Sequence, residues 1–273
     1  MSTQQGSYWY DNFQEETQVQ ELERLYRQAS TLLETERQMW PGLGILPGRS
    51  VLDLGCGSGV ITNELAKEVY PAQVTGIDIS QDLLRKSQLD CLANAKKERN
   101  ISFQEGNVYD LPFRDGVFDV VYARLIFQHL NKPLDALKNI WRVIKPGGLL
   151  CIVDVDRDWS SLYPEPQTSV NLDQAVIERQ IEQGGDPWVG RKLGHYLSSS
   201  RFVGIKTNVT LVDSDQLGLA NFFNMLSFGS TYNSEQNQLV KLQEEVRPDV
   251  QALLDSPYAW AGFGLFVVTG RKE

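Results

Sequence analysis

The stretch "VLDLGCGSGVIT", residues 51–62, decides the fold. Four residues of strand character, 51–54, run directly into three glycines within five positions, and the residues after Gly59 have helical character. Glycine permits a sharp turn from strand to helix and lets a ligand approach the backbone, because it has no Cβ. The stretch therefore predicts a strand, a tight turn and a helix, with either a ligand at the turn or the turn alone.

The residues around the turn indicate the charge of such a ligand. Gly55, Gly57 and Gly59 follow the spacing G-x-G-x-G, whereas a dinucleotide fingerprint requires G-x-G-x-x-G, and Val60 occupies the place of its last glycine. Asp53 lies two residues before the turn, where its carboxylate would repel a pyrophosphate and attract a cation. S-adenosylmethionine carries an ammonium and a sulfonium, so its charge fits this position.

A second carboxylate follows at the end of the next expected strand. Asp78, in "VTGIDIS", comes 21 residues after Gly57. This spacing places a carboxylate at the tip of the neighbouring strand, where it can accept hydrogen bonds from both ribose hydroxyls of a nucleoside. The alternative is that Asp78 caps the following helix. Its distance from the glycine turn favours the ribose role.

The rest of the chain alternates strands and helices, as a parallel sheet with crossover helices requires. Strands are expected to start at residues 50, 73, 101, 118, 149, 201 and 262. Helices are expected over 18–40, 59–69, 80–97, 133–144, 172–183, 190–200, 215–228 and 235–254, and a loop over 157–169. The first helix is amphipathic, with a polar side made by Glu21, Arg24, Arg27 and Gln28.

We interpret residues 1–273 as one domain, because no linker, repeat or low-complexity tract interrupts the chain. Its expected parts are an N-terminal helical cap (1–48), a ligand-binding core (50–155) and two lid segments on the side of a second substrate (156–200 and 213–258).

Composition excludes several classes of protein. The formal net charge of −9 disfavours a nucleic-acid partner. The three cysteines (Cys56, Cys91 and Cys151) and two histidines (His129 and His195) are too dispersed for a disulfide framework or a structural metal site. No apolar run is long enough for a membrane span, and the first residues lack a secretion signal, so we expect a cytoplasmic protein. The oligomeric state stays open.

Four motifs between residues 50 and 154 resemble those of class I S-adenosylmethionine-dependent methyltransferases: "VLDLGCGSG", "GIDIS", "EGNVYDLPFRDGVFDVVYA" and "IWRVIKPGGLLCIVD". Together with "VDVDRDW" and "DPWVGRKLGHYL", they are most similar to the small-molecule branch that includes the ubiquinone and menaquinone C-methyltransferases. The resemblance implies an α/β fold: a Rossmann-like seven-stranded sheet with only the last strand antiparallel, flanked by helices, with an N-terminal helix and a helical lid insertion.

The resemblance assigns cofactor-binding roles to nine residues: Asp53, Gly55, Cys56, Gly57, Asp78, Ile79, Asn107, Val108 and Arg124. The first acid and the glycine backbone would hold the methionine end, Asp78 the ribose, and Ile79 the adenine face. Asn107 stands where the family usually has Asp, and its amide oxygen can still accept from the adenine amino group. Val108 would donate its backbone amide to the ring, and Arg124 would approach the methionine moiety.

Residues for the methyl acceptor are harder to predict, because in-line methyl transfer needs alignment of the reactants and needs a base only if the acceptor must lose a proton. His129 is the catalytic candidate as a base, and a packing or capping role is the alternative. His195, Asp154 and Asp156 are further candidates. An aromatic lid or plain core is expected from Tyr8, Trp9, Tyr10, Trp159, Phe222, Phe223 and Phe228.

The sequence therefore predicts an S-adenosylmethionine-dependent methyltransferase that acts on a carbon, oxygen or nitrogen of a small molecule and releases S-adenosylhomocysteine. After the fourth strand "ARLI" replaces the tetrapeptide that is typical of enzymes acting on adenine or glutamine amino groups, which again disfavours nucleic acid. One alternative is a protein of this fold that catalyses a non-methylating reaction, such as a cyclisation, or only senses the cofactor. Another is a nicotinamide-dependent oxidoreductase.

Overall fold

A seven-stranded sheet forms the centre of the protein in a computed structural model, which describes residues 6–8, 10–93, 100–226 and 237–273. The strand order is β3-β2-β1-β4-β5-β7-β6. β7 pairs antiparallel with both β5 and β6, and the pairs from β3 to β5 are parallel, as expected. The strands are β1 (Val51–Leu54), β2 (Val74–Asp78), β3 (Ile101–Glu105), β4 (Phe118–Arg124), β5 (Ile144–Tyr163), β6 (Phe202–Asp213) and β7 (Trp260–Lys272).

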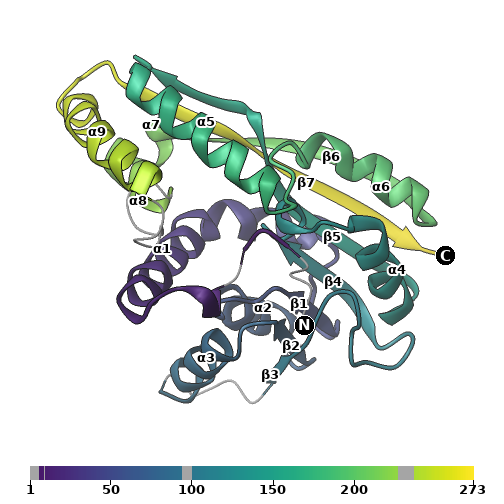
Figure 1. The fold of residues 1–273 in the computed structure, drawn as a ribbon. Helices are drawn as coiled ribbons and strands as arrows, with labels where there is room; N and C mark the ends of the chain where they lie inside the picture. The colour runs from purple at the N-terminus through teal and green to yellow at the C-terminus, as the bar shows by residue number, and fades with distance from the viewer. Residues whose placement is uncertain (1–5, 9, 94–99, 227–236) are drawn as a thin grey trace.

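Helices flank the sheet on both faces (Figure 1). The α-helices are α1 (Glu15–Met39), α2 (Val60–Val69), α3 (Gln81–Ala93), α4 (Pro133–Val143), α5 (Gln167–Glu182), α6 (Leu193–Ser199), α7 (Ser214–Leu217), α8 (Leu219–Met225) and α9 (Asn237–Leu254). Short 3-10 helices are η1 (Tyr10–Asn12), η2 (Trp40–Leu43), η3 (Phe127–His129) and η4 (Gly190–Lys192).

Side-chain alternation along the strands builds one apolar core on each face of the sheet. Val51 packs in a core with residues of α1, α2 and α8, while Leu52 and Leu54 point to the opposite core, which contains residues of α4 and α6. These central strands are buried on both faces, which is why they are apolar almost throughout.

The expected loop over 157–169 is wrong, because β5 continues through Tyr163. Beyond an irregularity between Val155 and Ser160, the strand pairs again with β7, from Ser160 opposite Phe263 to Tyr163 opposite Trp260. The sequence "RDWSSLY" has no regular apolar alternation, since most of these side chains are exposed. Residues 160–163 are a strand because they pair with β7, and their own sequence has no strand pattern.

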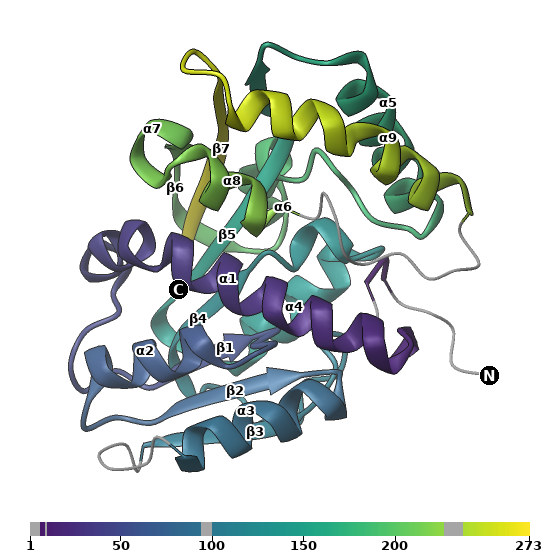
Figure 2. The ribbon, with the colours of Figure 1, turned by 90° about the vertical axis from the view of Figure 1, so that its left-hand side faces the viewer.

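The second half of the chain covers the tips of the parallel strands. α5 packs against α9 through Leu172, Leu239 and Val246, and α8 lies beside α1 (Figure 2). The helix expected over 215–228 is divided at Gly218, whose φ of 79° separates α7 from α8. The expected ends of two helices, near residues 97 and 228, lie outside the described residues. Among the helices described, none has the length and apolarity to cross a membrane.

Candidate functional site

A cavity of about 810 Å³ opens at the carboxyl ends of the parallel strands. Its walls come from the tips of β1, β2 and β4, from α1 and the segment before it, and from α5 and α8. The cavity brings together all ten residues that the sequence indicated as cofactor-binding or catalytic: Asp53, Gly55, Cys56, Gly57, Asp78, Ile79, Asn107, Val108, Arg124 and His129.

The glycine turn between β1 and α2 is held in a conformation that suits glycine. Gly55 and Gly57 have φ values of 73° and 51°. A Cβ on Gly55 would collide with the side chain of Ile126, whereas a Cβ on Gly57 would meet nothing within 4 Å. The backbone at Gly57 therefore borders open space in the cavity wall, where a ligand can approach it directly.

Asp78 connects the glycine turn to the end of β2. One of its carboxylate oxygens accepts from the backbone N–H of Gly57 at 2.8 Å, and the other accepts from the N–H of Ser80 at 2.9 Å. The hydroxyl of Ser80 accepts from the N–H of Leu83 and so caps α3. A carboxylate oxygen has a second lone pair, so both oxygens of Asp78 can still accept from a hydroxyl of a ligand.

Asp53 is a buried acid, 2% exposed, at the end of β1. The hydroxyl of Thr62 donates to its carboxylate at 2.6 Å. Burial raises the pKa of Asp53 to about 7, although the bond from Thr62 and the charge of Arg124 oppose this. Burial also raises the pKa of Asp78. A bound cation would favour the ionised carboxylate and offset the cost of burying it.

Three of the cofactor candidates, Ile79, Asn107 and Val108, line the cavity beyond the ends of β2 and β3. Ile79 is 37% exposed and offers an apolar surface at the cavity wall. The side-chain oxygen of Asn107 accepts from the backbone N–H of Tyr109 at 3.0 Å. This bond orients the amide of Asn107 in the cavity wall.

Arg124 lines the cavity but also joins the end of β4 to α1. Its guanidinium donates to Glu36 at 2.6 Å, and the same carboxylate accepts from the hydroxyl of Tyr122 at 2.5 Å. Glu36 is fully buried. The charge of Arg124 is therefore matched by Glu36, which the sequence did not single out because a single Glu within a helix carries no distinguishing signal.

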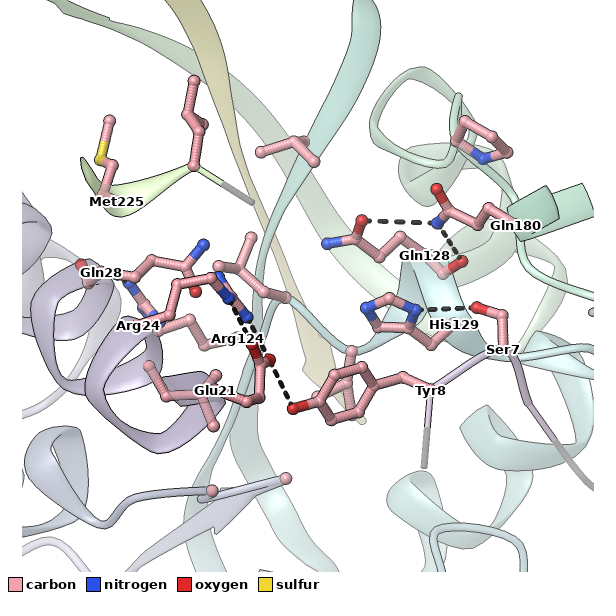
Figure 3. A pocket seen from close by; sticks show the side chains of 18 of the residues that line it. Ser7, Tyr8, Glu21, Arg24, Gln28, Arg124, Gln128, His129, Gln180 and Met225 are labelled. Atoms are coloured by element: carbon pink, nitrogen blue, oxygen red, sulfur yellow. Dashed lines mark hydrogen bonds and ion pairs between the residues drawn. The ribbon is translucent and has the colours of Figure 1, made fainter. Parts of the chain in front are cut away.

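Three residues from the polar side of α1, Glu21, Arg24 and Gln28, line the cavity. The sequence pattern predicted only that this side of the helix is polar. Glu21 is 1% exposed and Arg24 is 8% exposed. Two hydrogen bonds of 2.8 and 2.7 Å join the guanidinium of Arg24 to the carboxylate of Glu21, which also accepts from the hydroxyl of Tyr8 at 2.7 Å (Figure 3). Gln28 projects into the same space. Sequence analysis missed these residues, since periodicity identifies two sides of a helix but not what each side faces.

His129 ends η3 at the same wall. Its Nδ1 lies 2.8 Å from the hydroxyl oxygen of Ser7, and its ring packs against that of Tyr8 with centroids 5.4 Å apart. The other ring nitrogen points into the cavity (Figure 3). Burial, and after it the positive charge of Arg24, lower the pKa of His129 to about 4. The imidazole is therefore uncharged at neutral pH.

The remaining acceptor-side candidates have structural partners or lie elsewhere. Asp154 is buried behind the cavity, where it accepts from the backbone N–H groups of Gln128 and Val155. Asp156 lines the cavity, but the guanidinium and backbone of Arg191 bind its carboxylate. His195 is exposed on α6 and is not part of the cavity wall.

The expected aromatic lid is present only in part. Tyr8, Phe222 and Phe223 line the cavity, and the two phenylalanines also belong to the core beside α1. Tyr10 is buried outside the cavity wall, and Trp159 is 52% exposed and packs against Phe266. The other two aromatics of the expected lid, Trp9 and Phe228, lie outside the described residues.

Comparison with known proteins is consistent with this geometry. Residues 52–152 match the family model of a methyltransferase domain. An uncharacterized methyltransferase of Schizosaccharomyces pombe is 36% identical over 157 residues, which cover 56% of each chain. A demethylmenaquinone methyltransferase of Lactococcus lactis is 37% identical over 124 residues, covering 45% of this chain and 48% of that protein. The chain spans about half the length of the curated relatives that it matches.

The fold is shared with solved structures of low sequence identity. The crystal structure of the (4+2)-cyclase SpnF superposes with a TM-score of 0.58 at 18% identity, covering 88% of this chain and 80% of the cyclase. At this identity the similarity concerns the fold alone.

Proposed function

We propose that the whole protein transfers a methyl group from S-adenosylmethionine to a small-molecule acceptor in the cavity. The match of residues 52–152 to a methyltransferase domain supports this proposal. The observation that carries the proposal is a pair of carboxylates in the cavity wall beside the open backbone at Gly57: Asp53, which is buried, and Asp78, which is half-buried and accepts from the N–H of Gly57. A cationic nucleoside fits this arrangement, since it supplies positive charge to one acid and hydroxyls to the other.

Each candidate residue then has a role at a stated atom. The carboxylate of Asp53 would bind the ammonium of the methionine end, the oxygens of Asp78 would accept from the ribose hydroxyls, and Ile79, Asn107 and Val108 would contact the adenine. When bound, the cofactor supplies an activated methyl group on a sulfonium. Arg124, already bound to Glu36, holds α1 over the methionine end and helps to exclude water.

In the reaction, a lone pair or carbanion of the acceptor forms a bond to the methyl carbon while the carbon–sulfur bond breaks and its electrons pass to sulfur. The protein's task is to align the acceptor with that bond. The cavity of about 810 Å³ lies within the range of small-molecule sites. Its apolar wall, with Phe222, Phe223 and Met225, suits an acceptor with an apolar body, and the wall near Tyr8, Arg24 and His129 suits a polar group.

The net charge of −9 supports a small molecule over nucleic acid as the acceptor. The methylated atom of the acceptor is a carbon, an oxygen or a nitrogen, and we predict that the protein is cytoplasmic. A non-methylating reaction is the alternative that needs a test, because one fold can host unrelated reactions and one protein with this fold is a cyclase.

The test has two steps. Calorimetry with S-adenosylhomocysteine should show one binding site, and the absence of heat in correctly folded protein would overturn the proposal. Incubation with methyl-tritiated S-adenosylmethionine and fractionated metabolite pools should then yield a labelled small molecule. Binding without any transfer of label would favour the non-methylating alternative.

A further inference from the structure

Ser7 and His129 meet where the segment before α1 crosses the cavity wall. The backbone N–H of Ser7 donates to the carbonyl of His129 at 3.0 Å, and the adjacent residues Gly6 and Leu130 form an antiparallel bridge. These backbone contacts hold the hydroxyl of Ser7 at 2.8 Å from Nδ1 of His129. Gly185 packs on the other side of this hydroxyl, where a Cβ would lie 2.5 Å from the oxygen.

Hydrogen-bond accounting favours one of the two neutral tautomers of His129. A neutral imidazole has one N–H donor and one acceptor nitrogen, and the serine hydroxyl has one hydrogen to donate. In the part of the chain that the structure describes, Nδ1 of His129 is the side-chain acceptor within reach of the Ser7 hydroxyl. A hydrogen on Nδ1 would leave the serine hydrogen without a protein acceptor. A hydrogen on Nε2 satisfies both groups.

The charge state of the ring agrees with a neutral tautomer. Burial and the facing guanidinium of Arg24, on α1, both oppose a second proton on His129. Tyr8 lies against the ring as well, and its hydroxyl donates to Glu21. The ring nitrogen that points into the cavity has no hydrogen-bond partner recorded among the described residues, so it is available to a ligand.

We infer that Ser7 is a positioning residue that fixes His129 in the tautomer with its hydrogen on Nε2, and that this N–H donates a hydrogen bond to an oxygen of the methyl acceptor. The inference rests on the proposed function. It gives His129 the role of a donor that recognises and polarises the acceptor, in place of the base expected from the sequence. The N–H of His129 fits a methyl acceptor that carries a carbonyl, enolate or phenolate oxygen.

The tautomer can be measured without any substrate. The chain has two histidines, so protein labelled with nitrogen-15 histidine gives signals from His129 and His195 only. In the free protein at pH 7, long-range nitrogen–proton correlation should show a directly bonded hydrogen at Nε2 of His129 and an unprotonated Nδ1. A hydrogen on Nδ1 would overturn the inference.

Two variants of Ser7 separate positioning from structure. Ser7→Ala should leave His129 as a mixture of both neutral tautomers, and Ser7→Thr, which keeps the hydroxyl, should retain the single tautomer. An unchanged tautomer in Ser7→Ala would overturn the role of Ser7. The exposed His195 serves as the internal reference, and a melting curve of each variant checks folding. This measurement needs neither cofactor nor acceptor. It can therefore contradict the role of Ser7 while methyl transfer is observed, and it can support that role while no methyl transfer is found.

Activity provides a second readout once a labelled product is found. His129→Gln keeps an N–H donor at the end of the side chain but cannot act as a base at neutral pH. We expect His129→Gln to keep kcat within about tenfold and His129→Ala to lose about 100-fold or more. Equal losses in the two variants would contradict the donor role.

Discussion

Asp53 lies away from water with the hydroxyl of Thr62 as its partner, and burial raises its pKa to about 7. In the unfolded chain the pKa of an aspartate is about 4. The folded protein therefore keeps a proton that the unfolded chain has released between these two pH values. We expect the contribution of Asp53 to the free energy of unfolding of the cofactor-free protein to be highest below pH 4, to fall as pH rises toward 7, and to level off above 7.

Urea denaturation at several pH values between 4 and 8 measures this dependence. Asp154, whose pKa burial also raises to about 7, contributes in the same direction. Asp53→Asn should therefore make the free energy of unfolding fall less between pH 4 and pH 7 than in the natural protein. The double variant with Asp154→Asn should reduce this fall further, since His129, whose lowered pKa acts in the opposite direction, remains. A slope unaffected by both changes would show that these carboxyls do not titrate as their burial implies.

Asp78 combines a ligand role with a structural one. Asp78→Ala removes the acceptor proposed for two ribose hydroxyls, and each hydrogen bond to a charged group contributes about 1.5–3 kcal/mol. We expect calorimetry to show at least about a 100-fold loss of affinity for S-adenosylhomocysteine. The variant also frees the N–H groups of Gly57 and Ser80, so its stability should fall slightly.

Asp78→Asn is the matched control, because the amide keeps the shape and one acceptor oxygen and should lose less affinity. If Asp78→Ala bound S-adenosylhomocysteine as tightly as the natural protein, the ribose role would be wrong.

At this scale, the residues predicted to bind the cofactor all line the cavity, whereas only some of those predicted for the acceptor side do. Motif spacing places Asp53 and Asp78 at the tips of adjacent parallel strands, and the sheet brings such tips together whatever the rest of the chain does. Ser7, Glu21 and Arg24 reach the cavity only because of how α1 lies across it, and no local pattern encodes that contact.

Among the elements, α1 depends on a buried ion pair with β4. Glu36→Ala would leave the guanidinium of Arg124 buried without its carboxylate, a change that costs about 3–5 kcal/mol. We expect a loss of this size in the free energy of unfolding, measured by urea denaturation, together with weaker cofactor binding.

The same helix offers a control in the pair of Glu23 and Arg27, whose side chains are 64% and 51% exposed. Glu23→Ala should change stability little, because exposed pairs contribute little. Equal effects of the Glu23 and Glu36 variants would mean that the buried pair does not hold α1.

Strong periodicity made most elements predictable, and the two errors have physical causes. The outer part of β5 has exposed, mostly polar side chains, so only its pairing with β7 identifies it as a strand. Gly218 adopts a positive φ that divides one expected helix into α7 and α8, and composition alone does not specify a backbone angle.

For the molecule as a whole, the walls of the cavity come from segments that lie far apart in the chain. The sheet tips form one wall, and residues 6–8, α1, α5 and α8 form the other. A ligand that contacts both should stabilise the protein globally, by about 2.7 kcal/mol at a concentration 100 times its Kd. Differential scanning fluorimetry with S-adenosylhomocysteine should show the melting temperature rising by roughly 5 °C.

Hydrogen exchange locates this stabilisation. Saturation with S-adenosylhomocysteine should slow exchange most in the glycine turn, α1 and residues 6–8, and least in α6, which lies outside the cavity wall. Slowing confined to α6 or β6 would mean that the cofactor binds elsewhere.

One strand, β5, runs from Ile144, where it pairs with β4, to Tyr163, where it pairs with the start of β7. Its first part is locked between β4 and β7, while its last residues are exposed and pair only with β7. Substitutions at that far end of β5 should leave the glycine turn and the ends of β1 and β2 undisturbed. Under the proposed function, substitutions at Ser160 and Ser161, which line the cavity from this end of β5, would change the shape of the acceptor space and leave the glycine turn as it is.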